Sequence, residues 1–143
     1  MRWRLIDRIT AFTPQGSITG VASVSLDAYL LHEPLGRDGA WPESLLIGAC
    51  CELAHWFRAA TTDWQESTDL TDISDFSIIC PARAGELLTI TLAWEGDGTR
   101  ISIQGDRGCR VSGQMIFSFT TLAQRCDPQV VAEDWRVLRG QAA

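Results

Sequence analysis

The chain contains no lysine: all twelve of its positive charges are arginines, and eighteen acids give it a formal net charge of −6. A protein that binds nucleic acid needs a basic face to displace phosphate counterions, so this balance argues against that class. Arginines and acids are also unevenly distributed along the chain. Residues 97–143 contain six arginines and five acids, whereas residues 1–96 contain six arginines and thirteen acids. Arginines scattered over a solvated sheet would give the same count. If the uneven distribution does mark a binding surface, the C-terminal third is where an acidic partner would bind.

Segments that target or anchor a protein are also missing. No apolar run approaches the roughly eighteen residues that a membrane span needs, and residues 1–10 carry charge where the apolar part of a secretory signal would lie. We therefore expect a cytoplasmic protein with no membrane partner. The length of 143 residues and a hydrophobic content of 45% fit one globular domain. No repeat or linker divides the chain, so we expect a single domain over 1–143.

The cysteines have neither the number nor the spacing of a structural site. Five is odd, and no CxxC or Cys/His pair has the spacing of a zinc site. We expect reduced and mostly buried thiols, with no metal and no cofactor. The adjacent Cys50 and Cys51 could suggest a nucleophile, but a thiol in a buried helix stays protonated unless a positive group lowers its pKa. The cysteines are Cys50, Cys51, Cys80, Cys109 and Cys126.

One long buried helix is predicted from Glu43 to about Ala60. Pro42 suits a first helical turn, and Glu43 complements the positive end of the helix dipole. Apolar residues then recur at i, i+3 and i+4, and the positions between them are also largely apolar, which indicates a helix covered on all sides. Roughly eighteen residues at 1.5 Å each make a rod of about 27 Å. A rod of that length needs a whole sheet wrapped over it.

The rest of the chain alternates apolar and polar residues as strands do. Several strands around a single helix predict an α+β layer fold. A lone helix covers only one face of such a sheet and leaves a free edge, so we also expect dimerisation. We expect strands over 8–13, 17–26, 75–80, 86–94, 99–106 and 109–122, a long loop over 27–41, a polar connection over 61–72 and a short amphipathic helix over 127–140.

In their order and spacing, three segments resemble the hotdog fold, and in particular its 3-hydroxyacyl-acyl carrier protein (ACP) dehydratase branch. They are "LIDRITAF" (5–12), "DISDFSIICPARAGELLTITL" (72–92) and "VSGQMIFSF" (111–119). The resemblance covers about 5–122 and leaves 127–140 as a helical tail. It implies an antiparallel sheet wrapped around the long central helix.

The resemblance also implies a catalytic pair. His32 matches the family histidine and Pro34 the family proline, while Glu33 and Leu35 replace a phenylalanine and a glycine. In that family the histidine removes the C2 proton of the thioester. A buried carboxylic acid protonates the departing hydroxyl, and amides at the helix start polarise the carbonyl. Registering "WPESLLIGACCE" on the family helix puts Gly48 at the position of that acid and Glu52 at the position of a glutamine.

Because glycine cannot supply a proton, another carboxylate must replace the acid. Glu52 lies one turn beyond Gly48 on the same helix face and is the first candidate; Glu33 and Glu43 are rivals. A structural alternative is that Glu52 pairs with Arg58 or another arginine, or reaches solvent at an interface. His55 is expected to be a packed or hydrogen-bonded histidine.

A mid-helix glycine costs about 1 kcal/mol relative to alanine, so something is expected to approach Gly48 closely. An acyl chain or a partner backbone would do so. As the substrate-binding set, the resemblance implies Leu35, Gly36, Trp41, Pro42 and Gly48.

Three functions follow from the resemblance. The first is a lyase, a 3-hydroxyacyl-thioester dehydratase acting on acyl-ACP or acyl-CoA in fatty acid or polyketide-type biosynthesis. The second is a thioesterase in which Glu52 activates water. The third is a non-catalytic subunit that pairs with an active homologue. The expected assembly is a homodimer or higher oligomer, or a heterodimer in the third case.

Overall fold

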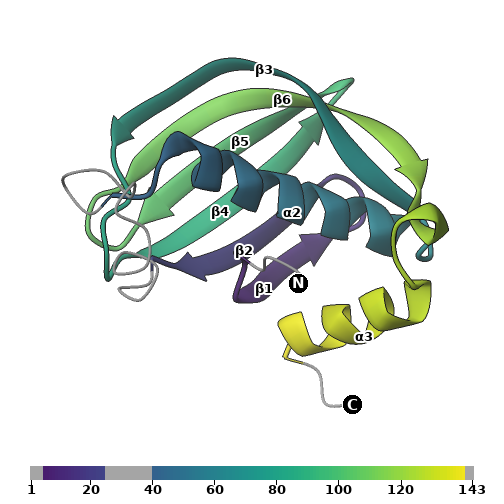
Figure 1. Cartoon of the computed structure of the whole chain (residues 1–143). Coiled ribbons are helices and arrows are strands. Elements are labelled where there is room, and N and C mark those ends of the chain that lie inside the picture. The colour runs from purple at the N-terminus through teal and green to yellow at the C-terminus, as the bar shows by residue number, and fades with distance from the viewer. Residues whose placement is uncertain (1–4, 25–39, 141–143) are drawn as a thin grey trace.

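The computed structural model describes residues 5–24 and 40–140. In it, one long helix lies along the concave side of a curved antiparallel sheet of six strands (Figure 1). The strand order is β1-β2-β4-β5-β6-β3. The elements are β1 (Arg8–Thr13), β2 (Ser17–Ser23), α2 (Glu43–Thr61), β3 (Glu66–Cys80), β4 (Leu87–Glu95), β5 (Gly98–Gly105), β6 (Arg110–Thr121), the short 3₁₀ helix η1 (Leu122–Gln124) and α3 (Pro128–Leu138).

The core lies between α2 and the sheet. Leu46 and Leu53 of the helix are fully buried, as are inward-facing residues of β2, β4 and β5 such as Ile18, Ile90 and Ile103. Each large side chain removed from water contributes about 1.5–3 kcal/mol, so this layer is a main source of stability. The predicted helix over 43–60 is confirmed, and so are the β1–β2 hairpin and the strands that follow β3. Most of their ends differ from the predicted ones by at most one residue, but β2 ends at Ser23, before the predicted end at 26, which lies outside the described residues.

Strand β3 differs from the sequence prediction. It runs for fifteen residues from Glu66, so most of the predicted polar connection over 61–72 is strand. Its pairing with β6 is irregular in three places, between Leu70 and Asp72, between Ser74 and Ser77, and between Ile78 and Cys80. Bulges of this kind break the two-residue alternation that marks a strand in a sequence. β3 is also an outer strand of the sheet, and its outer edge has no partner strand among the described residues.

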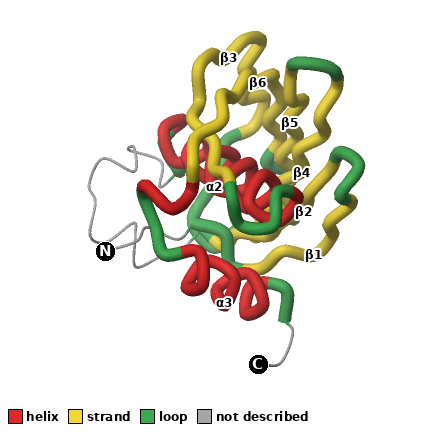
Figure 2. The backbone as a smooth tube through the Cα atoms, turned by 90° about the vertical axis from the view of Figure 1, so that its right-hand side faces the viewer, coloured by secondary structure: helices red, strands yellow, loops and turns green. Residues whose placement is uncertain are grey.

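The predicted C-terminal helix is confirmed as α3, which lies beside β1 (Figures 1 and 2). The Asp127 side chain accepts the Gln129 N–H at 3.0 Å and caps its first turn. Trp135 fixes the helix to the body of the protein, because its ring meets Phe12 edge-on at 5.0 Å. None of the helices within 5–24 and 40–140 combines the length and hydropathy that a membrane crossing requires.

Candidate functional site

The predicted site divides into a part that the structure places and a part that it does not. The placed residues Trp41, Pro42, Gly48 and Glu52 lie at the start and along the first half of α2. The remaining predicted residues fall outside the described ranges: His32, Glu33, Pro34, Leu35 and Gly36.

The start of α2 is tied to the connection between β3 and β4. The Trp41 N–H donates to the Ala82 carbonyl at 2.7 Å, and Ala40 forms an antiparallel bridge with Arg83. Pro42 is the N-cap residue. Its backbone is extended (φ −66°, ψ 156°), and its side chain makes no capping hydrogen bond. Its carbonyl accepts the N–H of Leu45 at 3.0 Å. The end of the predicted loop over 27–41 is therefore fixed beside the sheet.

Two kinds of hydrogen-bond donor at this helix start have no acceptor among the described residues. Within the described ranges no acceptor meets the amides of Glu43 and Ser44, which belong to the first turn of α2, where an intrahelical partner is absent. The Trp41 side chain is only 6% exposed, and its indole Nε1 likewise has no acceptor in the described part of the chain. A buried donor without a partner costs about 1–3 kcal/mol. Such donors suit a developing negative charge on a carbonyl oxygen.

The space beside Gly48 is occupied by the chain's own N-terminal segment. A Cβ built on Gly48 would lie 3.2 Å from Cδ1 of Leu5, which is tighter than ordinary contact. The sequence predicted a close approach at this position, and the approaching group in the structure is the Leu5 side chain.

Glu52 holds that same segment. Its Oε2 accepts the N–H of Leu5 at 2.9 Å and the N–H of Ile6 at 2.8 Å. Arg58, the expected ion-pair partner, instead donates from Nε to Glu66 at 2.5 Å. One carboxylate oxygen of Glu52 is therefore committed to the backbone just before β1. Sequence reasoning did not predict this contact, because its donors lie 46 and 47 residues away and backbone amides carry no residue-specific pattern.

The other titratable residues of α2 have structural surroundings. Glu43 is exposed in the first turn, where its charge complements the dipole. His55 Nδ1 lies 2.7 Å from the Oγ of Ser67 on β3, so it is a hydrogen-bonded histidine, as expected. Burial, with a smaller effect from Cys51, raises the pKa of Cys50 far above the ordinary thiol range. Burial also raises the pKa of Cys51. The expectation that these two residues stay thiols agrees with both shifts.

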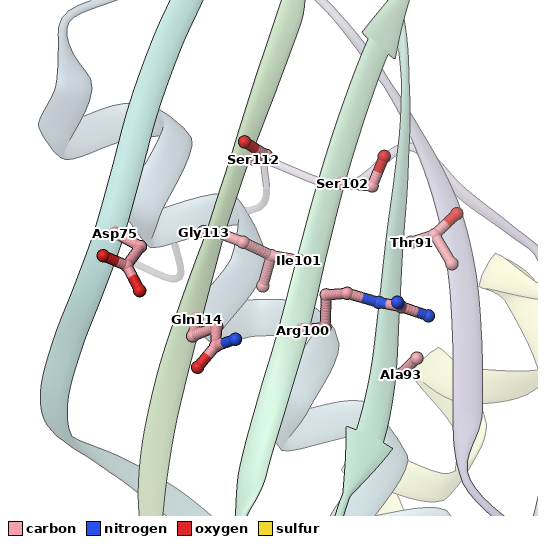
Figure 3. Close-up of a pocket in the computed structure, with 9 residues that line it drawn as sticks. All are labelled: Asp75, Thr91, Ala93, Arg100, Ile101, Ser102, Ser112, Gly113 and Gln114. Atoms are coloured by element: carbon pink, nitrogen blue, oxygen red, sulfur yellow. The ribbon is translucent and has the colours of Figure 1, made fainter.

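Nothing in the described ranges gathers metal ligands, since no group of three His, Cys, Asp or Glu side chains converges there. A hollow of about 530 Å³ lies elsewhere, on the side of the sheet opposite α2 (Figure 3). Thr91, Arg100, Ser102, Ser112 and Gln114 give it a polar lining. Arg100 there pairs with Glu95 at 3.0 Å. This hollow is separate from the helix start and contributes nothing to it.

No protein-family model matches the sequence, and no curated protein matches it. Solved structures do share its fold. The dehydratase heterocomplex ApeI:P from Xenorhabdus doucetiae superposes with a TM-score of 0.61 at 15% identity, over 80% of this chain and 81% of that one. A hot-dog-like protein from Thermanaerovibrio acidaminovorans gives 0.60 at 12%, over 87% and 92%. The thioesterase HI1161 from Haemophilus influenzae gives 0.58 at 14%, over 83% and 81%. The chain therefore has the hotdog fold.

Proposed function

We propose that this chain binds acyl thioesters and acts as a 3-hydroxyacyl-thioester dehydratase, with His32 as the base. The observation that supports this most is the set of donors at the helix start, the amides of Glu43 and Ser44 and the Trp41 indole. Removal of a C2 proton puts negative charge on the thioester oxygen, and donors fixed in advance stabilise that charge. Ala40, which directly follows the part of the chain that is not described, forms a bridge with Arg83 next to Trp41.

The source of the proton for the departing hydroxyl is not Gly48. Gly48 has no side chain to donate a proton, and one oxygen of Glu52 already accepts two backbone N–H groups. The proton must then come from the other oxygen of Glu52, from Glu33 or Glu43, or from a second subunit. ACP or CoA as the carrier, and a cytoplasmic role in fatty acid or polyketide-type biosynthesis, remain predictions.

A non-catalytic subunit is the second candidate function. It is favoured by the Leu5 side chain beside Gly48, because that side chain fills the place where the resemblance implies an acid. The similar ApeI:P structure is a dehydratase heterocomplex, so the fold is compatible with unlike subunits. The thioesterase alternative is equally compatible, since HI1161 is a thioesterase of this fold.

The assembly follows from the sheet. β3 is an outer strand, and Ile79 near its end is 62% exposed. We propose that two copies, or this chain and a homologue, pair along β3. Such pairing would continue the sheet and bring a second subunit beside α2.

The experiment that tests the function incubates the purified chain with a 3-hydroxyacyl-CoA and follows enoyl absorbance and thiol release together. Dehydration by the wild type should fall at least about 100-fold in His32→Ala, the usual scale for a general base. His55→Gln is the matched control, because His55 contacts Ser67 and is not part of the proposed chemistry.

The other outcomes separate the alternatives. Thiol release without enoyl formation, lost in Glu52→Gln but kept in His32→Ala, would establish the thioesterase. An inactive wild type that gains dehydration in Gly48→Glu, or on addition of an active homologue, would establish the non-catalytic subunit.

A further inference from the structure

Three arginines from separate segments lie at one end of the sheet. Arg83 lies in the β3–β4 connection, Arg107 in the β5–β6 turn and Arg110 at the start of β6. Arg110 pairs in register with Cys80 at the end of β3. The Arg107 guanidinium reaches across to the β3–β4 connection, because its Nη1 lies 3.5 Å from a Cβ built on Gly85. Figure 1 shows these strand ends at the same end of the molecule as the start of α2.

The three arginines, called here the arginine cluster, line two adjoining hollows. One, of about 400 Å³, has Arg83 and Arg107 in its wall. The other, of about 210 Å³, has Arg110. Cys80 and Gly108 belong to both. A ligand that spans both hollows would meet Arg83 and Arg107 in one and Arg110 in the other.

The charges of the arginine cluster are available to a ligand. All three residues are exposed, and none forms an ion pair within 5–24 and 40–140. Other arginines are committed, because Arg58, Arg100 and Arg125 each pair with a carboxylate. Two acids lie close to the cluster, Glu86 and Asp106, and both accept backbone N–H groups. Among the described residues, three positive and two negative charges give this region +1, in a chain of −6.

Glu86 makes the backbone under the cluster rigid. Its side chain belongs to a residue only 2% exposed, and it accepts the N–H of Arg83 at 3.2 Å, of Arg107 at 3.2 Å and of Cys109 at 2.7 Å. Gly105 packs against this carboxylate, so that a Cβ there would collide with it. A site whose backbone is held before the ligand arrives loses less entropy on binding.

Resting on the proposed function, we infer that the arginine cluster binds the phosphate on the pantetheine arm that carries the thioester. Guanidinium groups bind phosphate through paired, charge-assisted hydrogen bonds. The position fits this role, because Arg83 pairs with Ala40, and Ala82 accepts the N–H of Trp41 at the helix start. The thioester end would then lie at the donors of α2 while its phosphate lies at the cluster. The shared chemistry is a phosphate on pantetheine, whether supplied by CoA or by a carrier protein.

The test compares pantetheine, 4′-phosphopantetheine and CoA by calorimetric titration of the full chain. We expect 4′-phosphopantetheine to bind at least about tenfold more tightly than pantetheine, as charge-assisted contacts to one phosphate allow. The triple variant Arg83→Gln/Arg107→Gln/Arg110→Gln should lose that preference. The matched control is Arg100→Gln, which removes an exposed arginine near the start of β5, at the other end of that strand from the turn that carries Arg107. A further gain with CoA that also depends on the cluster would identify CoA as the carrier, and its absence would favour a carrier protein.

Equal binding by the wild type and the triple variant would overturn the inference, and so would an equal loss in Arg100→Gln. Inorganic pyrophosphate separates this failure from failure of the proposed function. If pyrophosphate binds the wild type but not the triple variant while no pantetheine compound binds, the anion site stands and the thioester function is wrong. If turnover is observed but neither pyrophosphate nor 4′-phosphopantetheine distinguishes the two proteins, the function stands and the phosphate site is wrong.

Discussion

Among single residues, Glu86 makes contacts whose loss should destabilise the fold. Its buried carboxylate accepts three backbone N–H groups from two connections. We expect Glu86→Ala to lower the free energy of unfolding by about 2–4 kcal/mol, because buried donors left without partners cost about 1–3 kcal/mol each and water satisfies some of them. Urea denaturation measures the change. Glu95→Gln is the control, since its exposed pair with Arg100 is worth at most about 1 kcal/mol. Equal losses in both variants would contradict the role of Glu86.

Buried thiols give a second prediction at this scale. Burial, then the nearby Glu86 charge and Cys80, raise the pKa of Cys109 to about 11. An unfolded cysteine titrates near 8.5, so the folded state holds its proton to higher pH than the unfolded state does. The stability this contributes is present below about pH 8.5 and is lost as the pH rises toward 11. Urea midpoints between pH 7.5 and 10.5 should fall, and less steeply in Cys109→Ala. The exposed Cys80→Ser should reduce the slope only slightly, because Cys80 makes the smallest of the three contributions to the shift.

The surroundings of individual residues on α2 were predictable where the contacts are local and not where they are distant. The hydrogen-bonded state of His55 and the inert thiols of α2 follow from their place on a buried helix. The contacts of Glu52 with Leu5 and Ile6 could not be predicted, because any backbone amide can be such a donor. A carboxylate in an apolar helix indicates that it has a buried partner, but the sequence does not identify that partner.

Among the elements, α2 shows what can be predicted from a sequence pattern, and β3 shows what cannot. α2 begins at Glu43 as predicted, because Pro42 and the apolar run specify its start in adjacent residues. The first half of β3 was predicted as a connection. Its bulges interrupt the alternation, and as an outer strand it keeps polar residues such as Asp69 and Asp72. Pairing with β6, which is set by the whole sheet, overrides the weak local preference.

The third prediction concerns α3. Trp135 holds α3 against the rest of the protein. The centroid of its ring lies 5.0 Å from that of Phe12 and 6.1 Å from that of Trp56. Trp135→Ala should cost about 3–5 kcal/mol, the usual range for a buried aromatic. Loss of the cap in Asp127→Ala should cost only about 1 kcal/mol. Urea denaturation gives both values. Val137→Ala, at a residue 64% exposed on the same helix, should be nearly neutral. A similar small loss in all three would mean that α3 is not part of the cooperative fold.

For the whole molecule, the unpaired edge of β3 decides whether one chain is the functional unit. An outer strand with exposed apolar residues invites a second strand, and a lysine on such an edge opposes pairing. If two copies pair along β3, Ile79→Lys should raise the dissociation constant of the dimer at least about tenfold, or about 1.4 kcal/mol. Sedimentation velocity over a concentration series measures it. Val137→Lys is the matched control, because Val137 on α3 is 64% exposed and Ile79 is 62% exposed.

The control also decides between two surfaces. A dimer that survives Ile79→Lys but dissociates in Val137→Lys would place the interface on α3. If Ile79→Lys gives a monomer that still binds 4′-phosphopantetheine but no longer dehydrates a 3-hydroxyacyl thioester, the phosphate site lies within one chain and the chemistry needs two. That combination is expected if the acid missing at Gly48 comes from the second subunit, because Arg83, Arg107 and Arg110 are all carried by one sheet.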